Sequence, residues 1–134
     1  MSNLELAINP NTSIEILDLL ANDFNHWVRY WVAYNSNTTP ETLSRLANDE
    51  DWSVRYGVAG NPNTSPETLD RLANDEDYRV RRWVAGNPDT PTETLELLSY
   101  DRHWYVRHYV TRNPNTPQYI KDYLKIKEFL NYYE

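Results

Sequence analysis

A recurring arginine with aromatic neighbours is the feature of this chain best suited to chemistry at a surface. The arginine stands every 26 residues, with a His, Trp or Tyr three positions before it and a His, Tyr or Arg one position after it. Guanidinium groups bind carboxylates and phosphates, and aromatic rings add apolar contact area or stack on bases. The row therefore predicts recognition of a partner. Its members are His26, Arg29, Tyr30, Trp52, Arg55, Tyr56, Tyr78, Arg81, Arg82, Trp104, Arg107 and His108.

Catalytic and cofactor chemistry find little support in the sequence. The chain has no cysteine, which excludes thiolate nucleophiles, thiolate metal sites and disulfides. Its three glycines form no phosphate-binding loop and no nucleophile elbow. His103 and His108 diverge around a helix and His26 is three repeats away, so we expect no metal site. The sequence predicts a protein that is not an enzyme and that carries no cofactor.

The row is carried by a repeat with a period of 26 residues. Leu69, Leu72 and Ala73 fall at i, i+3 and i+4 of a first helix, and Val80 and Val84 form an i,i+4 pair in a second one. Repeated helix pairs of this length predict an all-α solenoid of about five stacked two-helix units. The asparagines that open each copy are Asn9, Asn35, Asn61, Asn87 and Asn113.

The ends of the helices are also encoded in the repeat. Thr64 or Ser65 can cap the first helix, and Pro66 suits its first turn. In four of the five copies a proline follows the asparagine and ends the second helix, because proline disfavours helical geometry in the residue before it. Helices of about eight to ten residues do not persist alone in water, so stability must come from the stacking of units.

The repeat predicts a single repeat domain over residues 1–134. Residues 1–7 align only with the tail of a second helix and are expected to form a partial N-terminal cap. Residues 112–134 are expected to form a degenerate repeat with a C-terminal capping helix. The repeats between them are 8–33, 34–59, 60–85 and 86–111.

Composition favours an ordered, soluble protein. The chain has 11 tyrosines and 5 tryptophans, and disordered chains are poor in aromatic residues. The N-terminus has no basic leader, and no stretch approaches the roughly 18 apolar residues of a membrane span. We expect a cytoplasmic protein that does not associate with a membrane.

The formal net charge of −7 conceals a segregated charge distribution. The segments expected to form second helices contain no Asp or Glu, yet they hold eight of the 13 basic residues. Carboxylates are therefore expected in the first helices and turns, and a basic layer in the second helices. The acid-free segments are 24–34, 52–60, 78–86 and 102–112.

The repeated phrase resembles a known family. Asn-Pro-x-Thr-(x)-Pro-Glu-x-Leu-x-x-Leu-Ala-x-Asp, followed by Val-Arg-x-x-Val-Ala, is similar to the variant leucine-rich repeat of bacterial proteins, a relative of HEAT-like repeats. The match covers about residues 8–124. The resemblance implies a right-handed superhelix of short paired helices and a role in binding. Some members also carry a cysteine-ligated iron–sulfur centre, which a chain without cysteine does not inherit.

The repeated arginines have two interpretations. They can line a ligand-binding row, or they can bond the carboxylates and carbonyls of the turns between helices. The second is favoured, because a half-buried guanidinium needs such partners. The resemblance to HEAT repeats, in which an Asp six residues earlier commonly pairs with the arginine in an internal polar ladder, points the same way. The Asp and Arg pairs are Asp23 and Arg29, Asp49 and Arg55, Asp75 and Arg81, and Asp101 and Arg107.

The aromatic members of the row also have two interpretations. If Val28, Trp31 and Val32 face inward, the row faces outward onto the inner curve of the superhelix. Four helices about 8–10 Å apart would then give a strip on the order of 30–40 Å long. Alternatively, the rings pack between repeats.

From these patterns we expect a binding module that engages a protein or peptide along the strip, with an acidic segment favoured. One alternative is nucleic-acid binding by the same strip, although the net charge argues against affinity for bare duplex. Another is that the acidic outer face mimics nucleic acid and occupies a basic partner. The expected assembly is a monomer or a weak end-to-end homo-oligomer.

Overall fold

The structure is a computed structural model that describes residues 1–133. Within that range it consists of ten α-helices and has no β-strand, which confirms the all-helical prediction. In chain order the helices are α1 (Asn3–Ile8), α2 (Ile14–Leu20), α3 (His26–Tyr34), α4 (Pro40–Leu46), α5 (Trp52–Gly60), α6 (Pro66–Leu72), α7 (Tyr78–Gly86), α8 (Thr92–Leu98), α9 (Trp104–Arg112) and α10 (Gln118–Tyr133).

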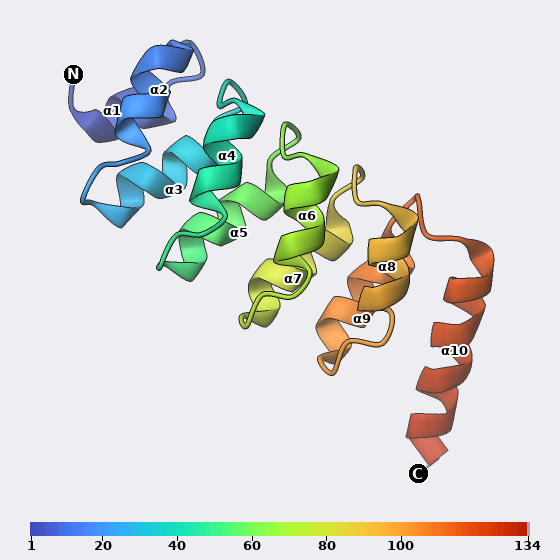
Figure 1. The fold of residues 1–134 in the computed structure, drawn as a ribbon. Helices are drawn as coiled ribbons and strands as arrows, with labels where there is room; N and C mark the ends of the chain where they lie inside the picture. Colours follow the sequence, from blue (N-terminus) through green and yellow to red (C-terminus); the bar gives the residue numbers. More distant parts are fainter. Residues whose placement is uncertain (134) are drawn as a thin grey trace.

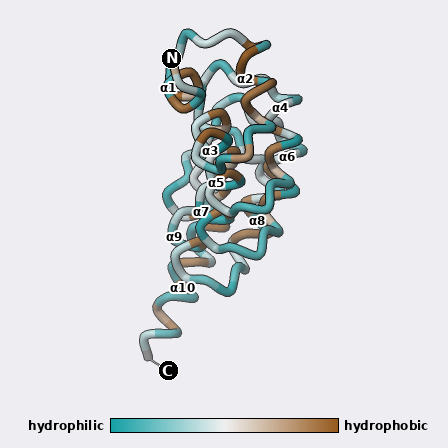
Figure 2. The backbone as a smooth tube through the Cα atoms, turned by 90° about the vertical axis from the view of Figure 1, so that its left-hand side faces the viewer, coloured by the Kyte–Doolittle hydropathy of each residue, from teal (hydrophilic) through white to brown (hydrophobic). Residues whose placement is uncertain are grey.

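The helices form two layers, which Figures 1 and 2 show from two directions. The second helices α3, α5, α7 and α9 stack side by side with α1 at one end, and the first helices α2, α4, α6 and α8 form the other layer. The main contacts between units join neighbouring second helices, whereas the first helices chiefly contact the second helices. The second helices therefore form a continuous helical layer, and the contacts within it hold neighbouring units together.

The core lies between the two layers and repeats with the sequence. Leu69 and Leu72 from α6 and Val80 and Val84 from α7 are each at most 2% exposed. Burial of one such side chain stabilises the fold by roughly 1.5–3 kcal/mol. The predicted apolar stripes are confirmed, because the equivalent leucines and valines of the other units are also buried.

The first helix of a unit begins at a hydroxyl cap. The Ser65 Oγ accepts a hydrogen bond from the backbone N–H of Thr68 at 3.2 Å. The neighbouring Thr64 hydroxyl instead donates to the carbonyl of Val58 at 2.6 Å, which ties the turn back to the preceding second helix. Ser65 is thus the cap, and Thr64 is a buried brace between two helices.

The asparagine that ends each second helix also connects neighbouring units. The Asn61 side-chain amide donates to the carbonyls of Ala33 at 2.7 Å and Asn35 at 2.9 Å, both in the preceding unit. Its Oδ1 accepts from the backbone N–H of Asn63 at 2.8 Å. Asparagines at the equivalent positions bond the preceding unit in the same way. The stacking of units therefore requires an asparagine at this position, in addition to the turn that begins there.

The two ends of the solenoid differ from the interior units. At the N-terminus, α1 packs on α3 in the place of a preceding second helix. At the C-terminus, α10 packs on α9 and has 16 residues, whereas α2, α4, α6 and α8 have seven each. Within residues 1–133 no second helix follows α10, so the outer side of α9 is not covered by another unit.

Candidate binding surface

The predicted row of arginines and aromatic residues divides into two sets. Arg29, Arg55 and Arg81 point to the turns between helices, where their side chains are only 12%, 11% and 6% exposed. The other members, including Arg107, are half-buried or exposed along the second helices. The expectation that the whole row looks outward is therefore wrong for these three arginines.

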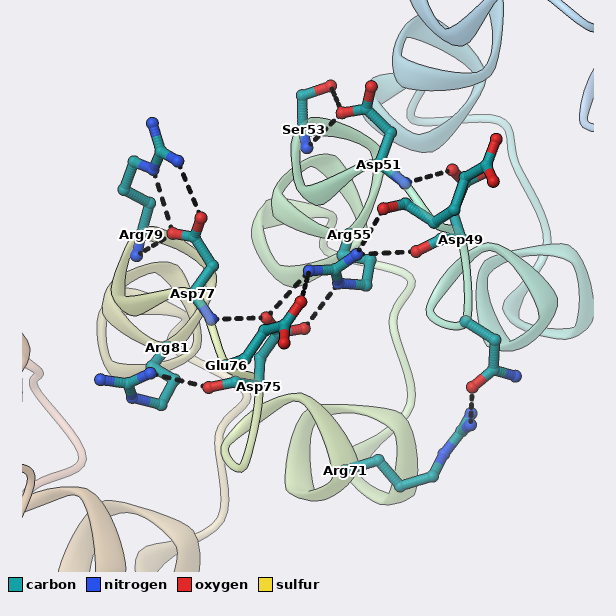
Figure 3. Close-up of polar contacts among 12 residues, drawn as sticks. Asp49, Asp51, Ser53, Arg55, Arg71, Asp75, Glu76, Asp77, Arg79 and Arg81 are labelled. Atoms are coloured by element: carbon teal, nitrogen blue, oxygen red, sulfur yellow. Dashed lines mark hydrogen bonds and ion pairs between the residues drawn. The ribbon is translucent and has the colours of Figure 1, made fainter.

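Arg55 shows how the buried arginines are held (Figure 3). Its Nε and Nη2 donate to the two carboxylate oxygens of Asp75, at 2.7 and 3.2 Å, so the pair is bidentate. Its Nη1 donates to the carbonyl of Asp49 at 2.8 Å. The hydrogen bond to Asp75 raises the pKa of Arg55. Nη1 also donates to the carbonyl of Glu50 at 3.2 Å, and a carboxylate oxygen of Glu76 lies 3.9 Å from Nη2. The guanidinium is thus paired chiefly with Asp75 and fixed by two carbonyls, as a buried charge requires.

The same pair recurs from unit to unit, and we call the series the ladder. Arg29 binds Asp49 and Arg81 binds Asp101, with Nε to Oδ2 distances of 2.7 Å. The interpretation that these arginines bond the turns is confirmed. The pairing suggested by HEAT repeats is wrong in its register, because each arginine takes the carboxylate of the following unit and only the backbone carbonyl of its own.

The ladder has two different ends. At the N-terminus, Asn3 occupies the position of the repeated arginine and donates to Asp23 Oδ2 at 2.8 Å. At the C-terminus, Arg107 keeps the carbonyl bond, from Nη1 to Asp101 at 2.6 Å. The position 20 residues further on is Lys127, so the structure of residues 1–133 offers Arg107 no ion pair. At the first end Asn3 supplies a side-chain amide in place of a guanidinium, and at the last end no carboxylate of residues 1–133 pairs with Arg107.

The side of the second-helix layer away from the first helices is rich in aromatic and cationic side chains, and we call it the open face. Its members are half-buried or exposed, and the second helices contain no carboxylate. The residues that define the open face are Trp27, Tyr30, Trp31, Tyr34, Trp52, Tyr56, Tyr78, Arg79, Arg82, Trp83, Trp104, Tyr105, His108, Tyr109 and Arg112.

The rings of the open face are both packed and accessible. Trp52 and Tyr56 lie against the core on one side and are half-buried overall. Tyr78 stacks on His103 with ring centroids 3.9 Å apart, yet 38% of it is exposed, and Trp104 is 63% exposed. His26 is half-buried beside Trp27, at a centroid distance of 4.9 Å. The two interpretations of the aromatic residues are therefore both partly correct.

The sequence row missed several residues of the open face. Trp27 and Tyr34 are each 52% exposed, and Trp31 is half-buried with its ring 5.6 Å from that of Tyr34. The expectation that Trp31 faces inward is confirmed only in part, because the ring packs against the core and yet stays half-buried on the open face. The signal was present in the sequence, because Trp27, Tyr30, Trp31 and Tyr34 stand at i, i+3, i+4 and i+7, the spacing of one helix face. The other missed residues are Arg79, Trp83, Tyr105, Tyr109 and Arg112.

Two glycines shape this surface. A Cβ on Gly60 would lie 3.0 Å from Cε3 of Trp83, and a Cβ on Gly86 would lie 3.1 Å from Cδ1 of Tyr109. Both distances are shorter than ordinary carbon contacts. The absence of a side chain at the end of one second helix therefore allows the large ring of the next second helix to lie over it.

Arg82 is the cation at the centre of the open face. Its guanidinium carbon lies 4.9, 5.4 and 5.9 Å from the ring centroids of Tyr105, Tyr109 and Tyr56. Its Nη2 donates to the Tyr56 hydroxyl at 3.3 Å. Hydrogen bonds from Tyr109 and then Arg82 lower the pKa of Tyr105. Among residues 1–133 no carboxylate pairs with Arg82, so its charge is balanced only by aromatic rings and hydroxyls.

Arg79 differs from Arg82 because it has a carboxylate. Its guanidinium lies 3.4 Å from the centre of the Trp52 ring, while its Nη2 is 2.8 Å from Asp77 Oδ2. The Arg79 hydrogen bond lowers the pKa of Asp77. Within residues 1–133, the open-face cations without an ion pair therefore lie on α7 and α9, at Arg82 and Arg112.

The described residues hold no other arrangement with evident chemistry. Residues 1–133 contain no group of three His, Asp or Glu side chains placed to hold a metal ion. None of the helices there combines the length and the apolar character that crossing a membrane requires.

Taken together, the stacked units and the ladder define an α-helical repeat scaffold. Residues 52–77 and 78–103 match the family model described as leucine rich repeat variant. The sequence of these two units is therefore similar to the leucine-rich repeat variant family, in agreement with the resemblance of the repeated phrase.

A solved structure described as "A leucine-rich repeat variant with a novel repetitive protein structural motif" is similar to 83% of this chain and to 72% of that chain, at 24% identity and a TM-score of 0.49. A search among curated proteins gave no match.

Proposed function

We propose that this protein is a non-enzymatic binding module that holds an extended acidic segment of a partner protein along the open face. The observation that carries the proposal is Arg82, a cation that lies among three tyrosines and has no carboxylate partner within residues 1–133. An anion from a partner would supply the missing charge. Charge-assisted hydrogen bonds of this kind are stronger than neutral ones.

The composition of the open face supports a protein partner. Tryptophan, tyrosine and arginine are the residue types enriched in the energetic centres of protein interfaces. The rings are held by their neighbours, as in the edge-on contact of Tyr56 with Trp83 at 5.3 Å, so little side-chain entropy is lost on binding. A segment of about ten to twelve extended residues would span the four helices.

Two shallow grooves at the ends of the second helices suit apolar side chains of such a segment. One, of about 320 Å³, is lined by Ile8, Trp31 and Tyr34 among others. The other, of about 180 Å³, is lined by residues that include Trp83 and Tyr109. The segment that fits best combines acidic residues beside Arg82 with an apolar residue at each of the two grooves.

Peptide binding measured by tryptophan fluorescence tests the proposal. The probe is a glutamate-rich peptide of about twelve residues with one aromatic residue at each end. We expect saturable binding that Arg82→Met weakens by about 30-fold or more, the loss typical of an interface hot spot. Arg45→Met is the matched control, because Arg45 lies in α4 of the other layer in an exposed ion pair with Asp18.

Equal effects of Arg82→Met and Arg45→Met would show that only overall charge matters, and would overturn the proposal. A single-stranded oligonucleotide of similar length is the second probe, because aromatic rings with arginine also suit base stacking. If the oligonucleotide binds more tightly than the peptide at the same salt concentration, the nucleic-acid alternative replaces the proposed function.

A further inference from the structure

The ladder contains three copies of one carboxylate receptor. In each copy an arginine Nη1 donates to a turn carbonyl of its own unit, and this bond orients the guanidinium. The Nε and Nη2 then bind both oxygens of an aspartate from the next turn, at 2.7 and 3.2 Å in every copy. The receptor is therefore a repeated and reproducible structure. Its arginines are Arg29, Arg55 and Arg81.

Arg107 is a fourth copy of the receptor without its aspartate. The orienting bond to Asp101 is present at 2.6 Å. Nε and Nη2 of Arg107 have no carboxylate among residues 1–133, because α10 continues as a helix through the position where the next turn would stand. Arg107 is half-buried on the side of α9 that no further unit covers within residues 1–133, so a carboxylate can reach it from outside this part of the solenoid.

The charge around Arg107 favours an anion. Residues 102–134 contain six basic and three acidic residues, whereas residues 1–101 contain seven basic and seventeen acidic ones. The C-terminal end of an acidic protein is therefore locally basic. Such a field raises the local concentration of anionic ligands and the rate at which they associate.

From these observations we infer that Arg107 binds the aspartate of an acidic turn in a partner protein, in the way that Arg55 binds Asp75. The partner turn would place its carboxylate against Nε and Nη2, as the next unit does elsewhere in the ladder. The aspartates inside the solenoid also accept a backbone N–H, as Asp75 does from Asp77 at 2.9 Å. A turn of the Asn-Asp-x-Asp type is therefore the expected ligand. The site lies on the ladder and does not depend on the open face.

A peptide copied from residues 73–78, Ala-Asn-Asp-Glu-Asp-Tyr, is the probe. In a titration followed by NMR of the arginine Nε–H groups, we expect the Arg107 signal to shift and the signals of Arg29, Arg55 and Arg81 to stay in place. Arg107→Gln should abolish the binding. The same peptide with Asn in place of its first Asp should bind at least about 10-fold more weakly, since bidentate charge pairing is lost.

Arg102→Gln is the matched control, because Arg102 is exposed near the same end of the molecule and should contribute only general attraction. If Arg102→Gln and Arg107→Gln weaken the peptide equally, the receptor assignment is wrong. Arg107→Lys keeps the charge but lacks the planar fork, so it should also lose most of the affinity while remaining folded. Retained affinity in Arg107→Lys would contradict the inference.

Two further outcomes separate this site from the other possibilities. Concentration-dependent self-association that Arg107→Gln removes, with no binding of the peptide, would assign the receptor to a second copy of this chain and overturn the inference. Arg82→Met should leave the turn peptide unaffected, so a failure at Arg107 is distinguishable from a failure of the proposed function.

Discussion

Arg81 and Arg82 are adjacent in α7, yet they belong to two different regions of the molecule. Arg81 points to the ladder, is 6% exposed and binds Asp101, whereas Arg82 points to the open face and lies among tyrosine rings. One residue along a helix is a rotation of about 100°, which is enough to exchange one environment for the other. Whether an arginine in this fold stabilises the ladder or can contact a partner therefore depends on the side of the helix from which it projects.

The two regions also differ in how they repeat. The ladder has the same arginine and the same carboxylate geometry in three successive units. At the open face, one position is Tyr30, Tyr56, Arg82 and His108 in the four successive second helices. A ladder residue must form an ion pair with the next unit, which restricts the residue type at that position. A residue of the open face forms no such repeated ion pair, so its type can vary to suit a partner.

The largest effect that separates the two regions is expected from Asp75→Ala. Removal of this carboxylate leaves the Arg55 guanidinium buried without its partner, which costs about 3–5 kcal/mol in other proteins. We expect a loss of that size in the free energy of unfolding from urea denaturation. A loss below about 1 kcal/mol would mean that the ladder is no more important than an exposed ion pair.

A smaller effect is expected from Gly60→Ala, which changes the support of the open face. The new Cβ meets the Trp83 ring at 3.0 Å, so the ring must shift. We expect destabilisation of about 1–2 kcal/mol, together with a change in tryptophan fluorescence. Gly57→Ala is a comparison variant, because the Cβ there meets the Ala33 Cβ at 3.0 Å and not a ring of the open face. It should destabilise without the spectral change.

Arg82→Met should affect stability by less than about 1 kcal/mol, because it removes a cation from aromatic rings and not from a buried ion pair. It should also raise the pKa of Tyr105, since Arg82 is one of the groups that lower it. The phenolate absorbance measured in a pH titration reports this change. An unchanged titration curve would indicate that Tyr109 alone perturbs Tyr105.

The smallest effect concerns the carboxylates that cap the second helices. Hydrogen bonds from Ser53 lower the pKa of Asp51 in the folded protein. The stabilisation from this group is therefore present above the ordinary carboxyl range and is lost as the pH falls through the lowered pKa. We expect Ser53→Ala to lower Tm at neutral pH and to match the unmodified protein at a pH where Asp51 is protonated in both. A difference in Tm that is constant with pH would contradict this.

Much of the fold was readable from the sequence. The apolar spacing of Leu69, Leu72, Val80 and Val84 located both helices of a unit, and the 26-residue period showed that the units stack. The first signal is local and the second is strictly periodic, so both can be recognised in the sequence without a structure. The site was read less well. The sequence predicts that Trp31 faces inward with Val28 and Val32, and its ring does pack against the core, but its spacing from Trp27 and Tyr34 also places it on the open face.

The sequence by itself determined the repeat, the apolar stripes of the helices and the separation of carboxylates from the second helices. Only the tertiary structure decided that Asp75 binds Arg55 of the preceding unit and gives Arg81 no more than its carbonyl. The physical reason is that partners 20 residues apart are chosen by the offset between stacked units. That offset depends on how whole helices pack, and no local pattern of residues encodes it.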